Sequence, residues 1–171
     1  MARRLRPAGL DFVRTAPVRL VFVREAAAAP DMIFRSLAED LTGWPEWFPG
    51  VSSVRPAGDG RAVRLRGGVR FEESVIAAEA PEVYAYRVDV TNMPGARAWV
   101  EEWRLSPAGT GSRVQMTFAL DGTAPFRLVW TLARPGVGRS FRDAVGKLDR
   151  RLAQGPRRRS VTHDDPRSDA G

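Results

Sequence analysis

The spacing of apolar residues changes along the chain, and these changes predict the order of its elements. Residues 18–24 (VRLVFVR) partly alternate and are rich in β-branched residues, which favours a first strand. Pro30 and Asp31 suit a first helical turn, and an apolar face of helical spacing continues to about residue 40. The aromatic segment 43–50 (GWPEWFPG) is rich in turn residues and has room for one more helical turn.

From residue 51 the apolar positions alternate with a period of two, which predicts six further strands. Their expected ranges are 51–55, 61–66, 69–78, 82–90, 96–105 and 112–120. The breaks between them contain turn sequences such as Gly-Asp-Gly, Gly-Gly and Asn-Met-Pro-Gly. Because the gaps between consecutive strands are short, we expect an antiparallel meander.

After residue 122 the period returns to about 3.6 residues, which predicts a long C-terminal helix. Its two apolar stripes contain Phe126, Val129, Trp130 and Ala133, and then Phe141, Ala144, Val145, Leu148 and Leu152. The pair Pro135-Gly136 is expected to bend or break this helix. The chain is therefore expected to be an α+β protein in which a curved, seven-stranded antiparallel sheet wraps a long final helix, with one or two short helices after the first strand.

Four segments of this pattern resemble the START-like superfamily, also called the SRPBCC or Bet v 1-like superfamily. They are 29–34 (APDMIF), 41–51 (LTGWPEWFPGV), 103–114 (WRLSPAGTGSRV) and the terminal amphipathic helix, and the resemblance covers about residues 17–153. Within the superfamily, the chain is most similar to the polyketide cyclase/dehydrase and lipid-transport group. The resemblance implies a helix-grip fold with a pocket between the sheet and the final helix. It leaves the chemistry open, because this fold occurs in cyclases, carriers, receptors and toxin-like proteins.

The tails differ in composition from the segment between them. Residues 17–153 are expected to form the START-like ligand-binding domain, residues 1–16 a loosely ordered leader, and residues 154–171 a disordered tail with almost no apolar content. No apolar stretch approaches the ~18 residues of a membrane span, and the basic N-terminus lacks the apolar core of a signal peptide. These features favour a cytoplasmic protein.

Composition excludes several chemistries. The sequence has no cysteine, and its only histidine, His163, lies in the polar tail, so we expect neither a thiol nucleophile, a Ser-His-Asp triad, a metal nor another cofactor in the fold. The net charge is +7, and arginines gather in residues 1–16 and 156–159. Because no aromatic residues are interleaved with these arginines, we expect no nucleic-acid partner.

Alternation along the strands brings two carboxylates to the inner face of the sheet. Glu73, together with Val75, and Glu101 have apolar neighbours two residues away, which places both acids inward. Tyr84 and Tyr86 lie on the apolar side of the intervening strand. Burial raises the pKa of a glutamate, and a carboxyl group with a pKa near neutral acts as a general acid or base. Glu73 and Glu101 are therefore the candidate catalytic residues.

Each candidate also has a purely structural interpretation. Either glutamate can be paired with an arginine or lie in water at the pocket mouth, and the aromatic residues can simply fill the core. The side chains expected to contact a ligand are Trp47, Phe71, Tyr84, Tyr86, Trp99, Trp103, Met116, Phe118, Phe141 and Val145.

Three hypotheses of function follow, and the sequence does not decide whether the chain is an enzyme. The first is binding, by a monomer or homodimer, of a small hydrophobic or amphipathic molecule for transport or sequestration. The second is an aromatic polyketide cyclase or dehydratase that uses the two glutamates. The third is a protein-interaction module of the toxin or chaperone-cofactor type. A closed pocket that holds both glutamates would favour the enzyme, a pocket lined only by apolar groups the carrier, and a collapsed cavity the interaction module.

Overall fold

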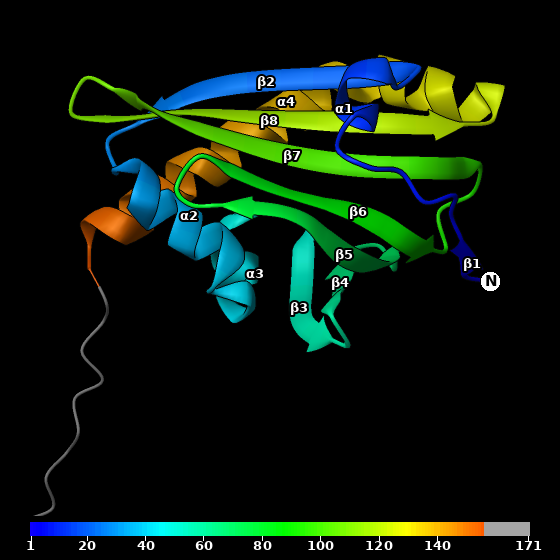
Figure 1. The fold of residues 1–171 in the computed structure, drawn as a ribbon, viewed down its shortest axis with the longest axis horizontal. Helices are drawn as coiled ribbons and strands as arrows, with labels where there is room; N and C mark the ends of the chain where they lie inside the picture. Colours follow the sequence, from blue (N-terminus) through cyan, green and yellow to red (C-terminus); the bar gives the residue numbers. More distant parts are fainter. Residues whose placement is uncertain (156–171) are drawn as a thin grey trace, which may run out of the picture.

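A strongly curved antiparallel sheet wraps one long helix in the computed structural model of the chain, which describes residues 1–155 (Figure 1). The elements in chain order are β1 (Arg3–Arg4), α1 (Phe12–Thr15), β2 (Val18–Ala26), α2 (Pro30–Ala38), the 3-10 turn η1 (Leu41–Gly43), α3 (Trp44–Trp47), β3 (Val51–Ala57), β4 (Gly60–Leu65), β5 (Arg70–Glu79), β6 (Val83–Thr91), β7 (Ala96–Ala108), β8 (Gly111–Gly122) and α4 (Ala124–Ala153). The strand order is β2-β8-β7-β6-β5-β4-β3, and β1 pairs with β6. The seven predicted strands and the antiparallel meander are confirmed.

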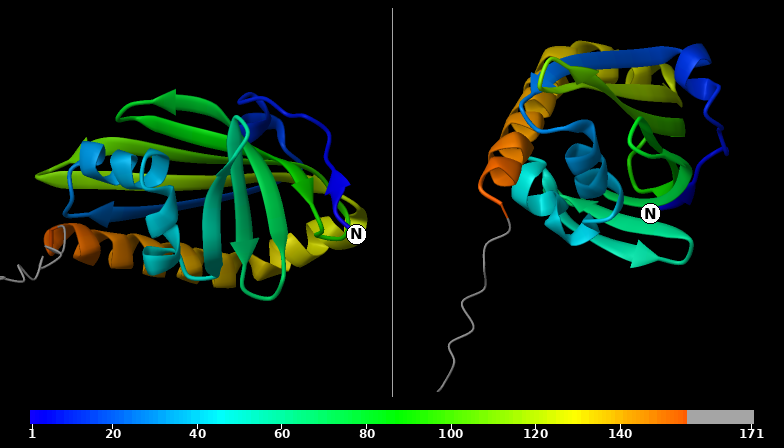
Figure 2. Two further views of the ribbon diagram at one scale, coloured as in Figure 1. Left: turned by 90° about the horizontal axis from the view of Figure 1, so that it is seen from below. Right: turned by 60° about the vertical axis from the view of Figure 1, so that its left-hand side comes forward.

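The long helix α4 closes the open side of the curved sheet. Figure 2 shows β2 and β8 at one end of the curl and β3 and β4 at the other, with α2 and α3 filling the remaining opening. Close packing of α4 on β2 depends on Gly138, because a Cβ atom there would lie 2.8 Å from a ring carbon of Phe22. The core lies between the sheet and α4, where Trp103 and Phe141 are buried as predicted.

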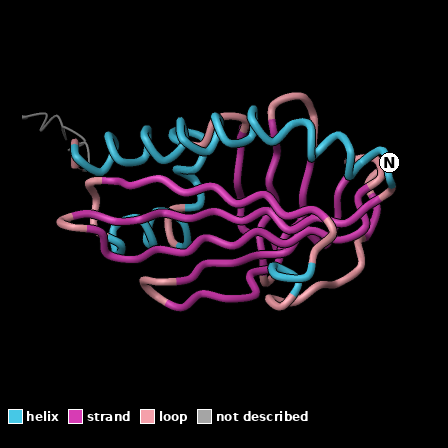
Figure 3. Tube along the Cα trace, turned by 90° about the horizontal axis from the view of Figure 1, so that it is seen from above, coloured by secondary structure: helices cyan, strands magenta, loops and turns pink. Residues whose placement is uncertain are grey.

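Of the two outcomes expected at Pro135-Gly136, a bend or a break, the break is wrong, because α4 is one continuous helix from Ala124 to Ala153 (Figure 3). Proline lacks the N–H that would bond to the carbonyl of Thr131. Both residues lie in an exposed turn of the helix, where water can satisfy that carbonyl. The first predicted stripe is also only half correct. Phe126 and Trp130 pack against the core, whereas Val129 and Ala133 are exposed.

The N-terminal segment is folded against the sheet, contrary to the loosely ordered leader expected for residues 1–16. β1 pairs with β6, and α1 lies on the convex face, opposite α4 (Figure 1). There Phe12 and Val13 pack with Ala98, Val100 and Ala119 in a second, smaller core. Apolar side chains lie among the arginines of this segment, and their burial stabilises its packing on the sheet. The high charge of the segment had suggested instead that it would not pack. The predicted disordered tail, apart from Gln154 and Gly155, lies outside the described residues.

One inward assignment on β5 is also wrong. Val75 is 40% exposed, although Phe71 and Glu73 on the same strand are buried. The pairing of β4 with β5 ends at Ser74, and the β5–β6 register shifts between Val75 and Ala77. Beyond Ser74, β5 therefore has a strand on one side only, which leaves Val75 at the edge of the sheet.

Candidate functional site

The concave side of the sheet contains a cavity of about 230 Å³ next to α4. Most of its wall is aromatic or aliphatic, and its charged lining residues are Arg61, Arg66, Glu73 and Glu101. Arg66 is exposed, whereas the other three are buried. The cavity thus combines an apolar wall with a compact polar cluster, which is the usual composition of a small-molecule site.

The structure brings some of the predicted site residues to this cavity and leaves others behind its wall. The predicted residues that line it are Phe71, Glu73, Tyr86, Trp99, Glu101, Phe118 and Phe141. The predicted residues that are buried but do not line it are Trp47, Tyr84, Trp103, Met116 and Val145. Both candidate acids therefore point into the concavity, whereas part of the expected aromatic wall belongs to the core.

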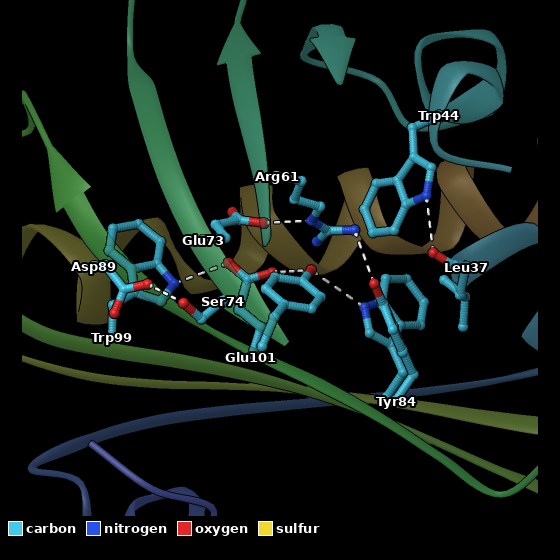
Figure 4. A network of polar contacts seen from close by, with 11 residues as sticks. Leu37, Trp44, Arg61, Glu73, Ser74, Tyr84, Asp89, Trp99 and Glu101 are labelled. Atoms are coloured by element: carbon cyan, nitrogen blue, oxygen red, sulfur yellow. Dashed lines mark hydrogen bonds and ion pairs between the residues drawn. The ribbon is translucent and has the colours of Figure 1, made fainter. Parts of the chain in front are cut away.

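Glu73 is held by a buried arginine. The β4–β5 register places Arg61 directly opposite Glu73, so both side chains leave the sheet on the same face. Arg61 Nε donates to Glu73 Oε2 at 2.6 Å, and both side chains are almost fully buried (Figure 4). The Arg61 guanidinium carbon also lies 4.3 Å from the ring centre of Trp44 and 4.0 Å from that of Tyr86. A third, longer cation–π contact and a 3.5 Å hydrogen bond join Arg61 to Tyr84, so Arg61 is held by one ion pair, one hydrogen bond and three cation–π contacts.

Trp44 is positioned for this contact by the short helices. Its indole Nε1 donates to the carbonyl of Leu37 in α2 at 3.2 Å (Figure 4). Neither Trp44 nor Arg61 was predicted as a site residue. Arginines in strands usually face water, which argued against Arg61 as a site residue. The sequence nevertheless contained a signal for it, because Val63 and Leu65 follow Arg61 at alternate positions and place it on the inward face of β4.

Glu101 is bound by neutral donors. The β6–β7 register places Tyr86 opposite Glu101, and the Tyr86 hydroxyl donates to Glu101 Oε2 at 2.5 Å. Trp99 Nε1 donates to Oε1 at 2.8 Å. The Tyr86 oxygen in turn accepts from Trp103 Nε1 at 3.3 Å. Each oxygen of Glu101 thus has one partner and keeps further acceptor capacity towards the cavity.

The two carboxyl groups differ in their electrostatic surroundings. Burial raises the pKa of Glu101 to about 7, and the negative charge of Glu73 contributes to this rise. Burial also raises the pKa of Glu73, but the charge and hydrogen bond of Arg61 oppose the rise. Burial raises the pKa of Tyr86 well above its ordinary value, so its hydroxyl remains a donor at neutral pH. The site therefore contains a paired carboxylate and a second carboxyl group that titrates near neutral pH.

The family is shown by the sequence itself. Residues 17–153 match the family model described as polyketide cyclase / dehydrase and lipid transport, and the chain belongs to this family. Uncharacterized proteins of Mycobacterium tuberculosis and Mycobacterium bovis are 29% identical over 149 residues, covering 83% of this chain and 89% of theirs.

Solved structures extend the likeness of the fold. XoxI from Bacillus cereus superimposes with a TM-score of 0.65 at 13% identity, covering 80% of this chain and 96% of XoxI. DynU16, from the dynemicin biosynthetic locus, superimposes with a TM-score of 0.58 at 17% identity, covering 80% of this chain and 48% of DynU16. Ara h 8.0201 superimposes with a TM-score of 0.57 at 14% identity, covering 77% of this chain and 97% of the Ara h 8.0201 chain. At these identities the likeness concerns the helix-grip fold alone.

Within residues 1–155, no helix combines the length and the apolar content needed to cross a bilayer.

Proposed function

We propose that this protein binds a small, largely apolar molecule in the cavity, with a hydrogen-bond donor of the ligand directed at Glu101. The observation that carries the proposal is the Glu101 carboxyl group, buried in the cavity wall and held by two neutral donors. A buried acceptor with spare capacity gains most from a ligand that brings its own donor.

The size of the cavity limits the ligand. A dry cavity of about 150 Å³ accommodates benzene, and this one measures about 230 Å³. A compound of one or two rings fits that space, whereas a longer molecule would project out of it.

The charges of the cavity also limit the ligand. The charge of Arg61 is already compensated by its buried ion pair with Glu73, so Arg61 offers a ligand carboxylate little net attraction. Placing a ligand carboxylate beside Glu101 would bring two like charges together in a buried site. A phenol or alcohol is therefore favoured over the corresponding acid.

A matched set of probes tests this proposal. We expect 2-naphthol to raise the melting temperature of the full chain and to titrate calorimetrically with one site, whereas 2-naphthoate should bind at least about tenfold more weakly. Glu101→Gln should weaken 2-naphthol binding, while the exposed Glu72→Gln should not. Equal binding of phenol and acid, or binding that is insensitive to Glu101→Gln, would refute the role of Glu101. Native mass spectrometry of the purified protein would reveal a co-purified ligand.

A second function, aromatic cyclisation or dehydration, is favoured by a different observation. Both carboxyl groups line the cavity, and the pKa of Glu101 lies at about 7, where a carboxyl group removes and returns protons efficiently. In this proposal Glu101 removes a proton from the carbon next to a substrate carbonyl, and Glu73 acts only through Arg61.

The test of the second function is turnover of short poly-β-ketone substrates. Glu101→Gln should abolish turnover, and the rate should rise with pH through about 7, as Glu101 becomes ionised. A rate that does not change on Glu101→Gln would refute this proposal.

A further inference from the structure

The first half of α4 carries a second apolar face, which is turned to solvent. Leu128, Val129 and Leu132 are 59%, 62% and 70% exposed. With Pro125 and Gly136 they follow the three- and four-residue spacing of a single helical face. The core contacts of this half of the helix come from the other side, so burial in the fold does not account for this stripe.

The charged residues of α4 along this stripe all have one sign. Between Asp121 and Asp143 the charged residues are Arg127, Arg134, Arg139 and Arg142, and all four are exposed. An apolar helix face bordered by arginines and without acidic residues is typical of helices that lie in the plane of a lipid surface.

The N-terminal arginines lie at the same end of the molecule. Arg3, Arg4, Arg6 and Arg97 border a shallow depression together with Gly95 and Thr123, the residue that precedes α4. The Thr123 amide donates to the Gly95 carbonyl at 2.9 Å, which fixes the start of the helix beside this cluster. Figure 3 shows that the N-terminus and the first turns of α4 lie towards the same end of the long axis of the molecule. One end of the molecule is therefore both basic and apolar.

The opposite side of α4 borders the cavity from the first half of the helix into its middle. Trp130, Val137, Ser140 and Phe141 of α4 line it, and Trp130 lies between Val129 and Leu132 of the exposed stripe in the sequence. A surface that covers the stripe would therefore lie next to the wall of the cavity.

We propose that Leu128, Val129 and Leu132, flanked by Arg127, Arg134 and Arg139, form a docking face for membrane surfaces that contain anionic lipids. The aliphatic side chains would enter the boundary between headgroups and acyl chains, and the arginines would contact the headgroups. A second copy of the chain is disfavoured as the occupant, because it would bring arginines against arginines without acidic partners. This proposal does not depend on the identity of the pocket ligand.

Vesicle flotation with the full chain tests the docking face. We expect binding to vesicles of phosphatidylcholine with roughly 30% phosphatidylglycerol, and much weaker binding to phosphatidylcholine alone. Leu128→Ser combined with Leu132→Ser should lower the partition coefficient at least about tenfold, because the apolar contribution is lost. The matched control is Met32→Ser combined with Val75→Ser, which removes two exposed apolar residues from α2 and β5 and should bind as the unaltered chain does.

Several outcomes would overturn the proposal. Binding that survives the leucine substitutions would mean that arginines alone, including those of residues 156–159, hold the protein to the vesicles. An equal loss of vesicle binding in the control variant would mean that the effect is not specific to α4. A dimer that becomes a monomer on the leucine substitutions, with no vesicle binding by either form, would assign the face to a second copy. A circular-dichroism melt of each variant establishes that it is folded.

Discussion

Replacing Glu101 with glutamine should change how the stability of the protein depends on pH. The pKa of Glu101 is about 7 in the folded chain and 4.5 in its ordinary state, so between these pH values the folded protein keeps a proton that the unfolded chain has released. Stability therefore falls as pH rises through this interval. At ~1.36 kcal/mol per pH unit, an interval of roughly 2.5 units corresponds to about 3 kcal/mol.

Glutamine does not titrate, so this loss should be absent from the variant. Its amide oxygen can accept from Tyr86, but its NH₂ group then faces the Trp99 N–H and cannot pair with it. That mismatch should cost about 1–3 kcal/mol at every pH. The variant should thus be less stable than the unaltered protein at about pH 5, and its relative stability should improve by about 3 kcal/mol by about pH 8.

Urea denaturation of both proteins at several pH values between about 5 and 8 measures this difference directly. Glu73, Arg61 and Tyr86 face Glu101 in both proteins, so most of their own pH dependence cancels in the comparison. Glu72→Gln, which alters an exposed neighbour, should give a difference that is flat with pH. A flat difference for Glu101→Gln as well would show that the group is not a buried carboxyl titrating near neutral pH.

Three further changes probe the core, the ion pair and the tail. Trp103 is fully buried, so Trp103→Ala should cost about 3–5 kcal/mol in equilibrium denaturation, and a loss below about 1 kcal/mol would contradict its place in the core. Glu73→Gln leaves Arg61 as a buried cation without its carboxylate and should lower the free energy of unfolding by about 3–5 kcal/mol. The double variant Arg61→Met with Glu73→Leu, which removes both charges, should recover most of this loss. A single variant as stable as the double variant would contradict this account. Removing residues 156–171 should leave the melting temperature unchanged, because the segment has almost no apolar residues, and a clear fall would reveal packing against the domain.

The fold could be predicted because most of its elements are half-buried and long enough to show a period. All seven strands from β2 to β8 follow an alternation visible in the sequence, and α2 and α4 follow the helical spacing. β1 and α1 could not be predicted in this way, since segments of two and four residues are too short to display a period. They are stabilised by pairing with β6 and by packing on the convex face, which are contacts between residues distant in the sequence.

The candidate site was predictable only in part, for a related reason. Apolar neighbours two positions away are enough to assign Glu73 and Glu101 to the inner face. Their partners depend on strand register, which places Arg61 opposite Glu73 and Tyr86 opposite Glu101. Alternation also cannot separate Tyr84 from Tyr86. Both side chains point inward, but only Tyr86 lines the cavity. How far along the curved sheet a residue lies from the cavity is set by the assembled fold and cannot be predicted from alternation.

The N-terminal segment has a practical consequence for anyone who trims this protein to its family boundary. The family match begins at residue 17, yet Phe12 and Val13 lie outside it and cover Ala98, Val100 and Ala119 on the back of the sheet. A recombinant chain that starts at Pro17 would expose this apolar patch to water and would lose the strand that pairs with β6. Such a chain is expected to precipitate at concentrations that the full chain tolerates, so purification tags belong ahead of Met1 rather than in place of the first sixteen residues.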